Sequence, residues 1–115
     1  MVYRSYPPPP QLEPYIDCFW SLELPVTQSE GRVERVLPDG KMELLFHYGD
    51  CFENSCDGKS FNEQARGLFA GQLKTFTLLK PKGNIGLVAV RFKPAGAAQF
   101  FEFPLSEITD QVMSL

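Results

Sequence analysis

The sequence predicts a mostly β protein, an antiparallel barrel or sandwich with short helices near its C-terminal end. Residues 16–24 alternate apolar and polar side chains, and residues 85–92 form a nearly continuous apolar run, so both are expected to be strands. Nine glycines and ten prolines separate short apolar runs, as turns do in an all-β fold. A chain of 115 residues suits one domain with its own hydrophobic core.

The first half of the chain is expected to contribute three strands. The prolines at 7–10 form a stiff, extended lead-in. After the strand at 16–24, residues 33–37 form a second strand, and the Pro-Asp-Gly sequence at 38–40 reverses the chain. Residues 42–48 return as a third strand, so that 33–37 and 42–48 are predicted to pair as a hairpin.

The second half alternates turns with shorter strands. Residues 50–58 are expected to form a polar loop, and short strands are expected after it at 60–62, 68–72 and 75–79. Residues 81–84 form a turn before the strand at 85–92, whose continuous apolar character predicts burial on both faces.

Short helices are expected after this last strand. Between residues 95 and 101 the pattern becomes helical and places Phe100 and Phe101 on one face. Pro104 ends this helix, because proline cannot continue it, and Ser106 caps a second short helix.

Charge and cysteine content exclude several classes of protein. The formal net charge is −3, whereas a freestanding nucleic-acid-binding domain carries a basic excess. No apolar run approaches the roughly 20 residues of a membrane span, and no secretory signal is visible. Three cysteines, an odd number, favour a reducing compartment. We therefore expect a cytoplasmic protein that contacts neither a membrane nor, by itself, DNA.

Enzyme chemistry is not expected. The chain has one histidine, His47, whereas metal-dependent small β-barrels use two or three histidines with a carboxylate. No phosphate-binding glycine loop and no pairing of a nucleophile with a base is visible. We predict no catalytic residue, no cofactor and no metal. Two alternatives remain open, a zinc site at His47, Cys51 and Cys56 and a labile disulfide between the two cysteines.

One basic residue lies in an unusual position. Residues 64–101 carry six basic and no acidic side chains, which can hold an anion or interleave with the acidic first half through strand pairing. Arg91 interrupts the apolar strand at 85–92, where an unpaired guanidinium is costly to bury. Its partner is either Glu43, as a structural ion pair, or the carboxylate or phosphate of a ligand.

Glu43, His47 and Arg91 are the candidate ligand-binding residues, because they are polar positions on otherwise apolar strands. We expect an effector among them, in the interior of a barrel. Strand register gives a competing expectation. Glu43, Leu45 and His47 share one face of their strand, and the opposite face is more apolar, which favours solvent-facing polar residues and an interior filled by side chains.

Several stretches, in order, resemble the N-terminal domain of bacterial AraC-type transcriptional regulators. They are YIDCFW at 15–20, RVLPDGKMELLF at 35–46, VRFKPAGAA at 90–98 and FPLSEITD at 103–110. The resemblance spans nearly the whole chain and implies a cupin-like regulatory domain that senses a small-molecule effector, mediates homodimerisation, or does both. It also implies C-terminal helix-turn-helix motifs that contact DNA and are absent from this chain. No effector-binding residue is carried over from the family.

We therefore expect residues 1–115 to be a single regulatory domain of such a regulator. Phe100, Phe101 and Phe103 are the candidate dimer contacts, and they could equally be core residues. The alternatives are a freestanding cupin-like small-molecule-binding protein without metal catalysis and a dimerisation module without a ligand.

Overall fold

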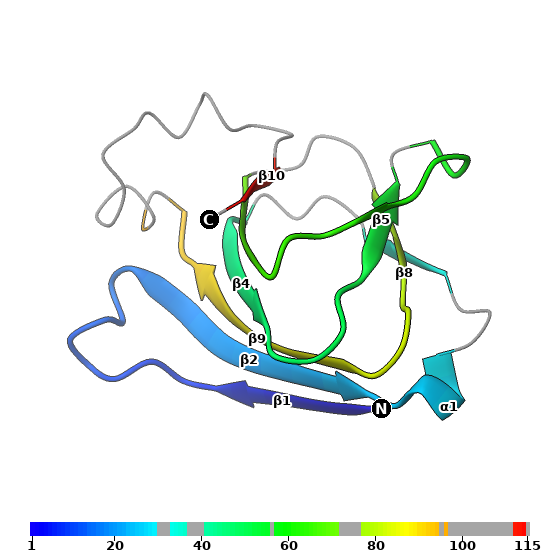
Figure 1. Ribbon diagram of the computed structural model, residues 1–115. Helices are drawn as coiled ribbons and strands as arrows, with labels where there is room; N and C mark the ends of the chain where they lie inside the picture. The colour runs from blue at the N-terminus through cyan, green and yellow to red at the C-terminus, as the bar shows by residue number, and fades with distance from the viewer. Residues whose placement is uncertain are drawn as a thin grey trace.

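The computed structural model describes residues 1–29, 33–36, 41–55, 57–71, 77–94, 96 and 112–114. They form two facing antiparallel sheets (Figure 1). The larger sheet has the order β1-β2-β9-β4-β7-β10, with bounds Val2–Tyr6, Ile16–Leu24, Ile85–Phe92, Glu43–His47, Gly67–Ala70 and Val112–Ser114. The smaller sheet has the order β3-β8-β5-β6, with bounds Glu34–Val36, Thr77–Lys80, Glu53–Ser55 and Asn62–Glu63. A short helix, α1 (Val26–Ser29), follows β2.

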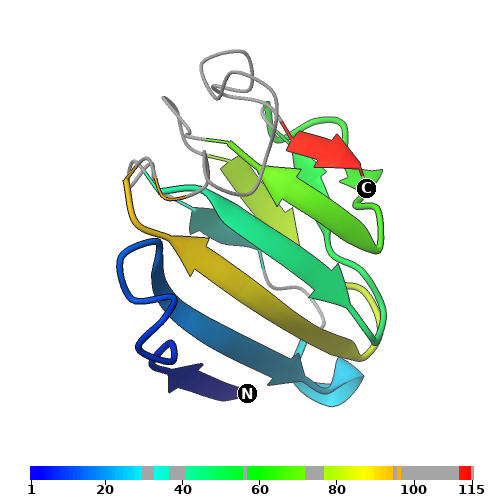
Figure 2. The ribbon, with the colours of Figure 1, turned by 90° about the vertical axis from the view of Figure 1, so that its left-hand side faces the viewer.

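The predicted fold class is confirmed, in the form of a sandwich. Figure 2 shows the larger sheet face-on, with β1 and β10 at opposite edges. Across the described ranges these edge strands do not pair with each other, so the sheet does not close into a barrel. The helices expected after residue 95 lie outside the described residues. No helix in the described part of the chain is long and apolar enough to cross a membrane.

The two strands with the clearest sequence patterns begin and end at the predicted residues. These are β2, with its alternating side chains, and β9, with its long apolar run. The shorter strands β3, β4, β6, β7 and β8 overlap their predicted ranges but differ from them by a few residues at their ends. Short strands carry fewer repeats of the pattern, so the sequence locates their ends less well.

The predicted hairpin between 33–37 and 42–48 is wrong. β3 pairs with β8 in the smaller sheet, whereas β4 lies in the larger sheet between β9 and β7. A strand has two edges, and the apolar strands β9 and β7 occupy both edges of β4. No edge of β4 is left for β3, although a turn-forming sequence separates the two strands.

Three strands form where the sequence predicts none. β1 lies directly before the prolines at 7–10. All five of its residues are exposed, so it has no buried face that would create an alternating pattern. β5 lies inside the predicted polar loop at 50–58, because its backbone is held between β8 and β6 despite its polar composition. β10 pairs with β7 at the other edge of the larger sheet.

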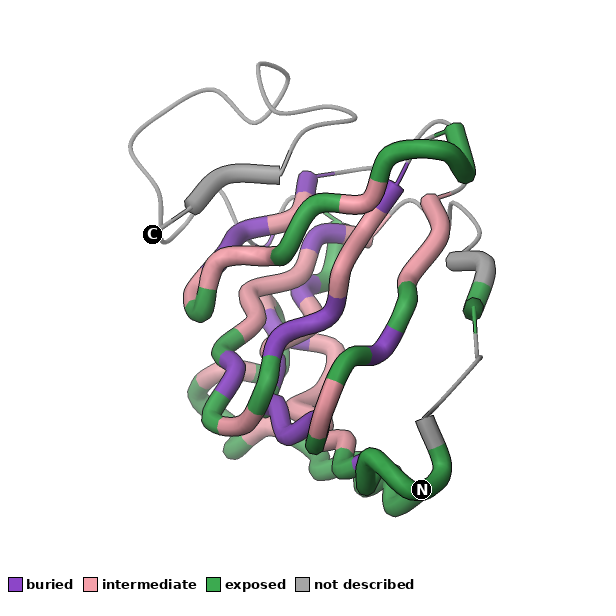
Figure 3. The backbone as a smooth tube through the Cα atoms, turned by 45° about the vertical axis from the view of Figure 1, so that its right-hand side comes forward, coloured by how far each residue is buried: buried purple, intermediate pink, exposed green. Residues whose placement is uncertain are grey.

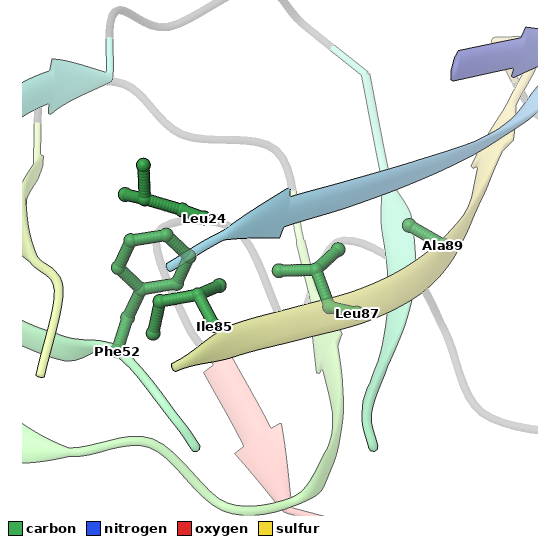
Figure 4. Packing of buried hydrophobic residues seen from close by; sticks show 5 residues of the cluster. All are labelled: Leu24, Phe52, Ile85, Leu87 and Ala89. Carbon is green, nitrogen blue, oxygen red and sulfur yellow. The ribbon is translucent and has the colours of Figure 1, made fainter. Parts of the chain in front are cut away.

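One core cluster lies on the inner face of the larger sheet, defined here as the face turned toward the smaller sheet. Ile85, Leu87 and Ala89 alternate along β9 and point into this cluster (Figure 4). Phe52, which precedes β5, and Leu79 of β8 pack against them from the other layer. Because it contains side chains from both sheets, this cluster holds the two layers together.

A second cluster lies on the opposite, outer face of the larger sheet. Phe69 of β7 and Phe92 of β9 pack there with Ile16 and Met42, and their rings lie 6.2 Å apart between centroids. Tyr15, from the segment between β1 and β2, packs against the cluster. The larger sheet therefore buries apolar side chains on both faces at this end.

The expectation that β9 is buried on both faces along its length is wrong for its middle. Val88 is 45% exposed on the outer face, and its Cα partner on β4, Phe46, is 44% exposed. The outer cluster covers the end of β9 near Phe92 and stops short of Val88. Figure 3 shows buried stretches alternating with exposed ones along the strands, as expected where successive side chains point to opposite faces.

Candidate functional site

An ion pair on the inner face joins two neighbouring strands. Arg91 on β9 is the Cα partner of Glu43 on β4, so their side chains leave the sheet on the same face. The Nε of Arg91 donates a hydrogen bond to Oε1 of Glu43 over 2.6 Å. The two side chains are 27% and 20% exposed, which makes the pair half-buried and open to solvent on one side. The structural partner expected for Arg91 is therefore Glu43.

The pair keeps hydrogen-bonding capacity that the described part of the chain does not use. Burial opposes the charged form of Arg91, but the hydrogen bond and charge of Glu43 outweigh it, and the pKa of Arg91 lies above its ordinary value. Within the described residues, the two Nη amino groups of Arg91 make no hydrogen bond, and neither does the second carboxylate oxygen of Glu43. A positive charge with unused donors thus lies beside an unused acceptor.

Aromatic side chains lie next to this pair. The Trp20 ring on β2 lies 6.0 Å from Cζ of Arg91, within the range of a cation–π interaction. Tyr3 on β1 lies beside the indole, with 5.8 Å between ring centroids. The indole Nε1 of Trp20 is buried and has no hydrogen-bond partner in the described part of the molecule. This donor and the two rings were missed by sequence reasoning, because β1 was not predicted and Trp20 was only one of the apolar positions in the strand at 16–24.

His47 lies on the inner face but away from this pair. Its Cα partner on β9 is Leu87, so it is four residues along β4 from Glu43, or about 13 Å at the usual rise of a strand. It is 5% exposed, and its Nε2 lies 3.1 Å from Oε1 of Gln64. The structure therefore brings Glu43 and Arg91 together and separates His47 from them.

The competing expectation that the polar face of β4 turns toward solvent is wrong. Glu43, Leu45 and His47 face the smaller sheet, whereas Phe46 and Tyr48 are exposed on the outer face. Sequence reasoning assigned burial to the more apolar face. Here both faces of the larger sheet bury apolar clusters, so the balance of apolar residues along one strand does not identify the inner face.

Lowering the pH below about 6.5 is expected to destabilise the fold through His47. Burial lowers the pKa of His47 in the folded chain, although the hydrogen bond to Gln64 works in the opposite direction. The unfolded chain therefore binds the proton first, and stability present above pH 6.5 is lost as the pH falls toward the folded pKa. Urea unfolding at about pH 7.5 and about pH 5.5 measures this loss.

The variant His47→Gln is the control for this prediction. It keeps a polar side chain of similar size but cannot titrate, and the chain has no second histidine to replace it. Its free energy of unfolding should change less between the two pH values than that of the parent chain. An equal change in both proteins would assign the effect to other groups.

The zinc and disulfide alternatives both include Cys56, so they stay predictions. Cys18 and Cys51 are free thiols, and burial raises the pKa of Cys51 despite the nearby charge of Arg66. No group of three or more potential metal ligands occurs among the residues that the structure describes. Cys56 lies outside them, as do the candidate dimer contacts Phe100, Phe101 and Phe103.

A groove on the outer face offers different chemistry. It has a volume of about 150 Å³ and lies over β1, β2, β9 and β4, lined by Tyr6, Phe19, Trp20, Ser21, Phe46, Val88, Ala89 and Val90. It contains no charged side chain, so it lacks the convergent polar groups that define most small-molecule sites. The inner-face residues Arg91, Glu43, Trp20 and Tyr3 are therefore the stronger candidate, and we call them the inner-face site.

These features define an antiparallel β sandwich with a candidate small-molecule site on the inner face of its larger sheet. The chain belongs to the family described as Domain of unknown function (DUF6597), which matches residues 4–114. No curated protein and no solved structure matches the chain.

Proposed function

We propose that this chain is the regulatory domain of an AraC-type bacterial transcriptional regulator and binds a small-molecule effector at the inner-face site. The resemblance of residues 15–20, 35–46 and 90–98 to such domains supports the regulatory role. The domain acts in the cytoplasm as a homodimer and takes no part in catalysis. DNA contact belongs to a separate helix-turn-helix domain, which agrees with the formal net charge of −3 on this chain.

The proposed ligand site rests on the partly exposed ion pair of Arg91 and Glu43, whose remaining polar atoms make no hydrogen bond within the described residues. Sites for small molecules combine apolar walls with a few convergent polar groups. Arg91 and Glu43 supply such groups, and Trp20 and Tyr3 supply aromatic surface beside them. The remaining polar atoms of the pair are reachable from solvent, so a ligand can bind them without first breaking a hydrogen bond within the described residues.

A thermal-shift screen of metabolites against the 115-residue chain tests this proposal. A compound that binds the folded chain at one hundred times its Kd stabilises it by about 2.7 kcal/mol. The expected result is a compound that raises the Tm of the parent chain and has a much smaller effect on Arg91→Gln. Lys93→Gln is the matched control, because it removes one positive charge from an exposed residue directly after β9.

Two outcomes would overturn the proposed site. One is a screen in which no compound stabilises the parent chain, which would favour a dimerisation module without a ligand. The other is a stabilising compound whose effect is the same in Arg91→Gln and in the parent chain. The melting of each variant without ligand is recorded first, so that a change in fold is distinguished from a change in binding.

A further inference from the structure

Two ion pairs lie at the inner-face site. Arg91 and Glu43 form one neutral pair, and Lys41 and Asp17 form a second one with 2.8 Å between Nζ and Oδ2. The second pair is within electrostatic reach of the first, because Lys41 mainly, and Arg91 and Lys93 to a smaller extent, lower the pKa of Asp17. A ligand at this site therefore meets a positive group and a negative group side by side.

Among the described residues, the ion pair leaves one set of donors and one acceptor without a hydrogen bond. A guanidinium has five N–H donors, and Arg91 uses its Nε–H for Oε1 of Glu43. The remaining donors lie on its Nη groups, which match the two oxygens of a carboxylate. Oε2 of Glu43 can accept from a ligand N–H or O–H. The matching ligand thus presents an acceptor and a donor a short distance apart.

We propose that the inner-face site recognises a zwitterionic small molecule of the free α-amino acid class. Its carboxylate binds the Nη groups of Arg91, and its ammonium group binds Oε2 of Glu43. This inference rests on the proposed function, since it names the ligand class of the same site.

Ligands with a single charge fit the site less well. A simple carboxylate attracted by Arg91 lies close to the carboxylate of Glu43, and at such distances the repulsion offsets much of the attraction. A simple amine attracted by Glu43 meets Arg91 in the same way. A molecule that carries both charges on groups joined through one carbon gains both attractions, because each of its charges faces the opposite one.

The side chain of the ligand meets aromatic surface. The Trp20 ring lies beside Arg91, and the ring of Tyr3, which is 52% exposed, extends this aromatic surface. Apolar and aromatic side chains gain most from such contacts. We therefore expect amino acids such as phenylalanine and leucine to bind more tightly than aspartate or lysine, whose charged side chains would lie against the aromatic rings.

Calorimetric titration of the chain with a panel of free L-amino acids tests the inference. The best ligand is then compared with two matched analogues. For phenylalanine these are phenylalaninamide, which lacks the carboxylate, and 3-phenylpropanoate, which lacks the ammonium group. Removing either charge should weaken binding at least about tenfold. Equal binding of phenylalanine and either analogue would overturn the proposed zwitterionic ligand class.

Variants of the two charged residues give a second readout. Glu43→Gln should bring the amino acid and 3-phenylpropanoate to similar affinities, because the partner of the ammonium group is removed. Arg91→Lys retains the positive charge and so protects the fold, but it loses the paired donors and should weaken binding of both carboxylates. Lys93→Gln should bind as the parent chain does.

The outcomes separate this inference from the proposed function. If no amino acid in the panel binds but another compound binds in an Arg91-dependent way, the proposed zwitterionic ligand class is wrong, whereas the proposed ligand site is retained. If no compound of any class binds, the ligand site itself is wrong.

Discussion

Phe69→Ala is expected to lower the free energy of unfolding by about 3–5 kcal/mol, the largest effect of any substitution considered for this protein. Phe69 is 1% exposed and packs in the outer cluster with Ile16, Met42 and Phe92. Removing its ring loses the buried apolar surface and leaves a cavity, because β7 is held by β4 and β10 and cannot move inward freely. Urea unfolding followed by circular dichroism measures the change.

Phe46→Ala is the matched control. It makes the same chemical change on the same face of the larger sheet, but Phe46 is 44% exposed. Its cost should be about 1 kcal/mol or less, because exposed side chains contribute little to a packed core. Equal costs for the two substitutions would mean that the outer cluster is not a true core.

Gly49→Ala is expected to cost about 2–3 kcal/mol, because the new methyl group has no room. An added Cβ would lie 2.6 Å from the carbonyl oxygen of Asn84 and 2.8 Å from the amide nitrogen of Gly86. Both are backbone atoms and cannot rotate away as a side chain can. Relief requires the two segments to separate, which breaks the hydrogen bonds from Gly49 N to Gly86 O and from Asp50 N to Asn84 O.

Gly58→Ala is the control for this backbone contact. Gly58 has a positive φ of 78°, which strains any L residue, but its added Cβ would meet only Leu78 Cδ1 at an ordinary 3.5 Å. It should cost about 1 kcal/mol through that strain alone. Chemical denaturation measures the free energy of unfolding of both variants. If Gly49→Ala is no less stable than Gly58→Ala, the two segments separate easily.

The contact at Gly49 also matters for the inner-face site. It fixes the end of β4 against the start of β9, through hydrogen bonds from Tyr48 N and Gly49 N to Gly86 O. The register set there places Glu43 opposite Arg91 at the other end of the two strands. A slip by one residue would turn Glu43 to the outer face and break the ion pair. Substitutions at Gly49 are therefore expected to weaken ligand binding as well as stability.

The sequence by itself determined the elements whose signal lies in neighbouring residues. The alternation in β2 and the apolar run in β9 locate both strands to the residue, because a strand with a buried face repeats its pattern over many positions. The sequence also predicts that Arg91 needs a partner, since an unpaired guanidinium inside an apolar run is costly to bury in any fold. Glu43 was the acidic residue named for it, and it is the partner that the structure shows.

Only the tertiary structure decided which strands pair and which face of each is buried. β4 joins β9 and β7 instead of β3, and this places Glu43 beside Arg91 and leaves His47 opposite Leu87. β1 brings Tyr3 to Trp20 from a segment that carries no burial pattern. Strand periodicity depends on residues adjacent in the chain, whereas strand pairing depends on competition between distant segments for the same edges, which no local pattern encodes.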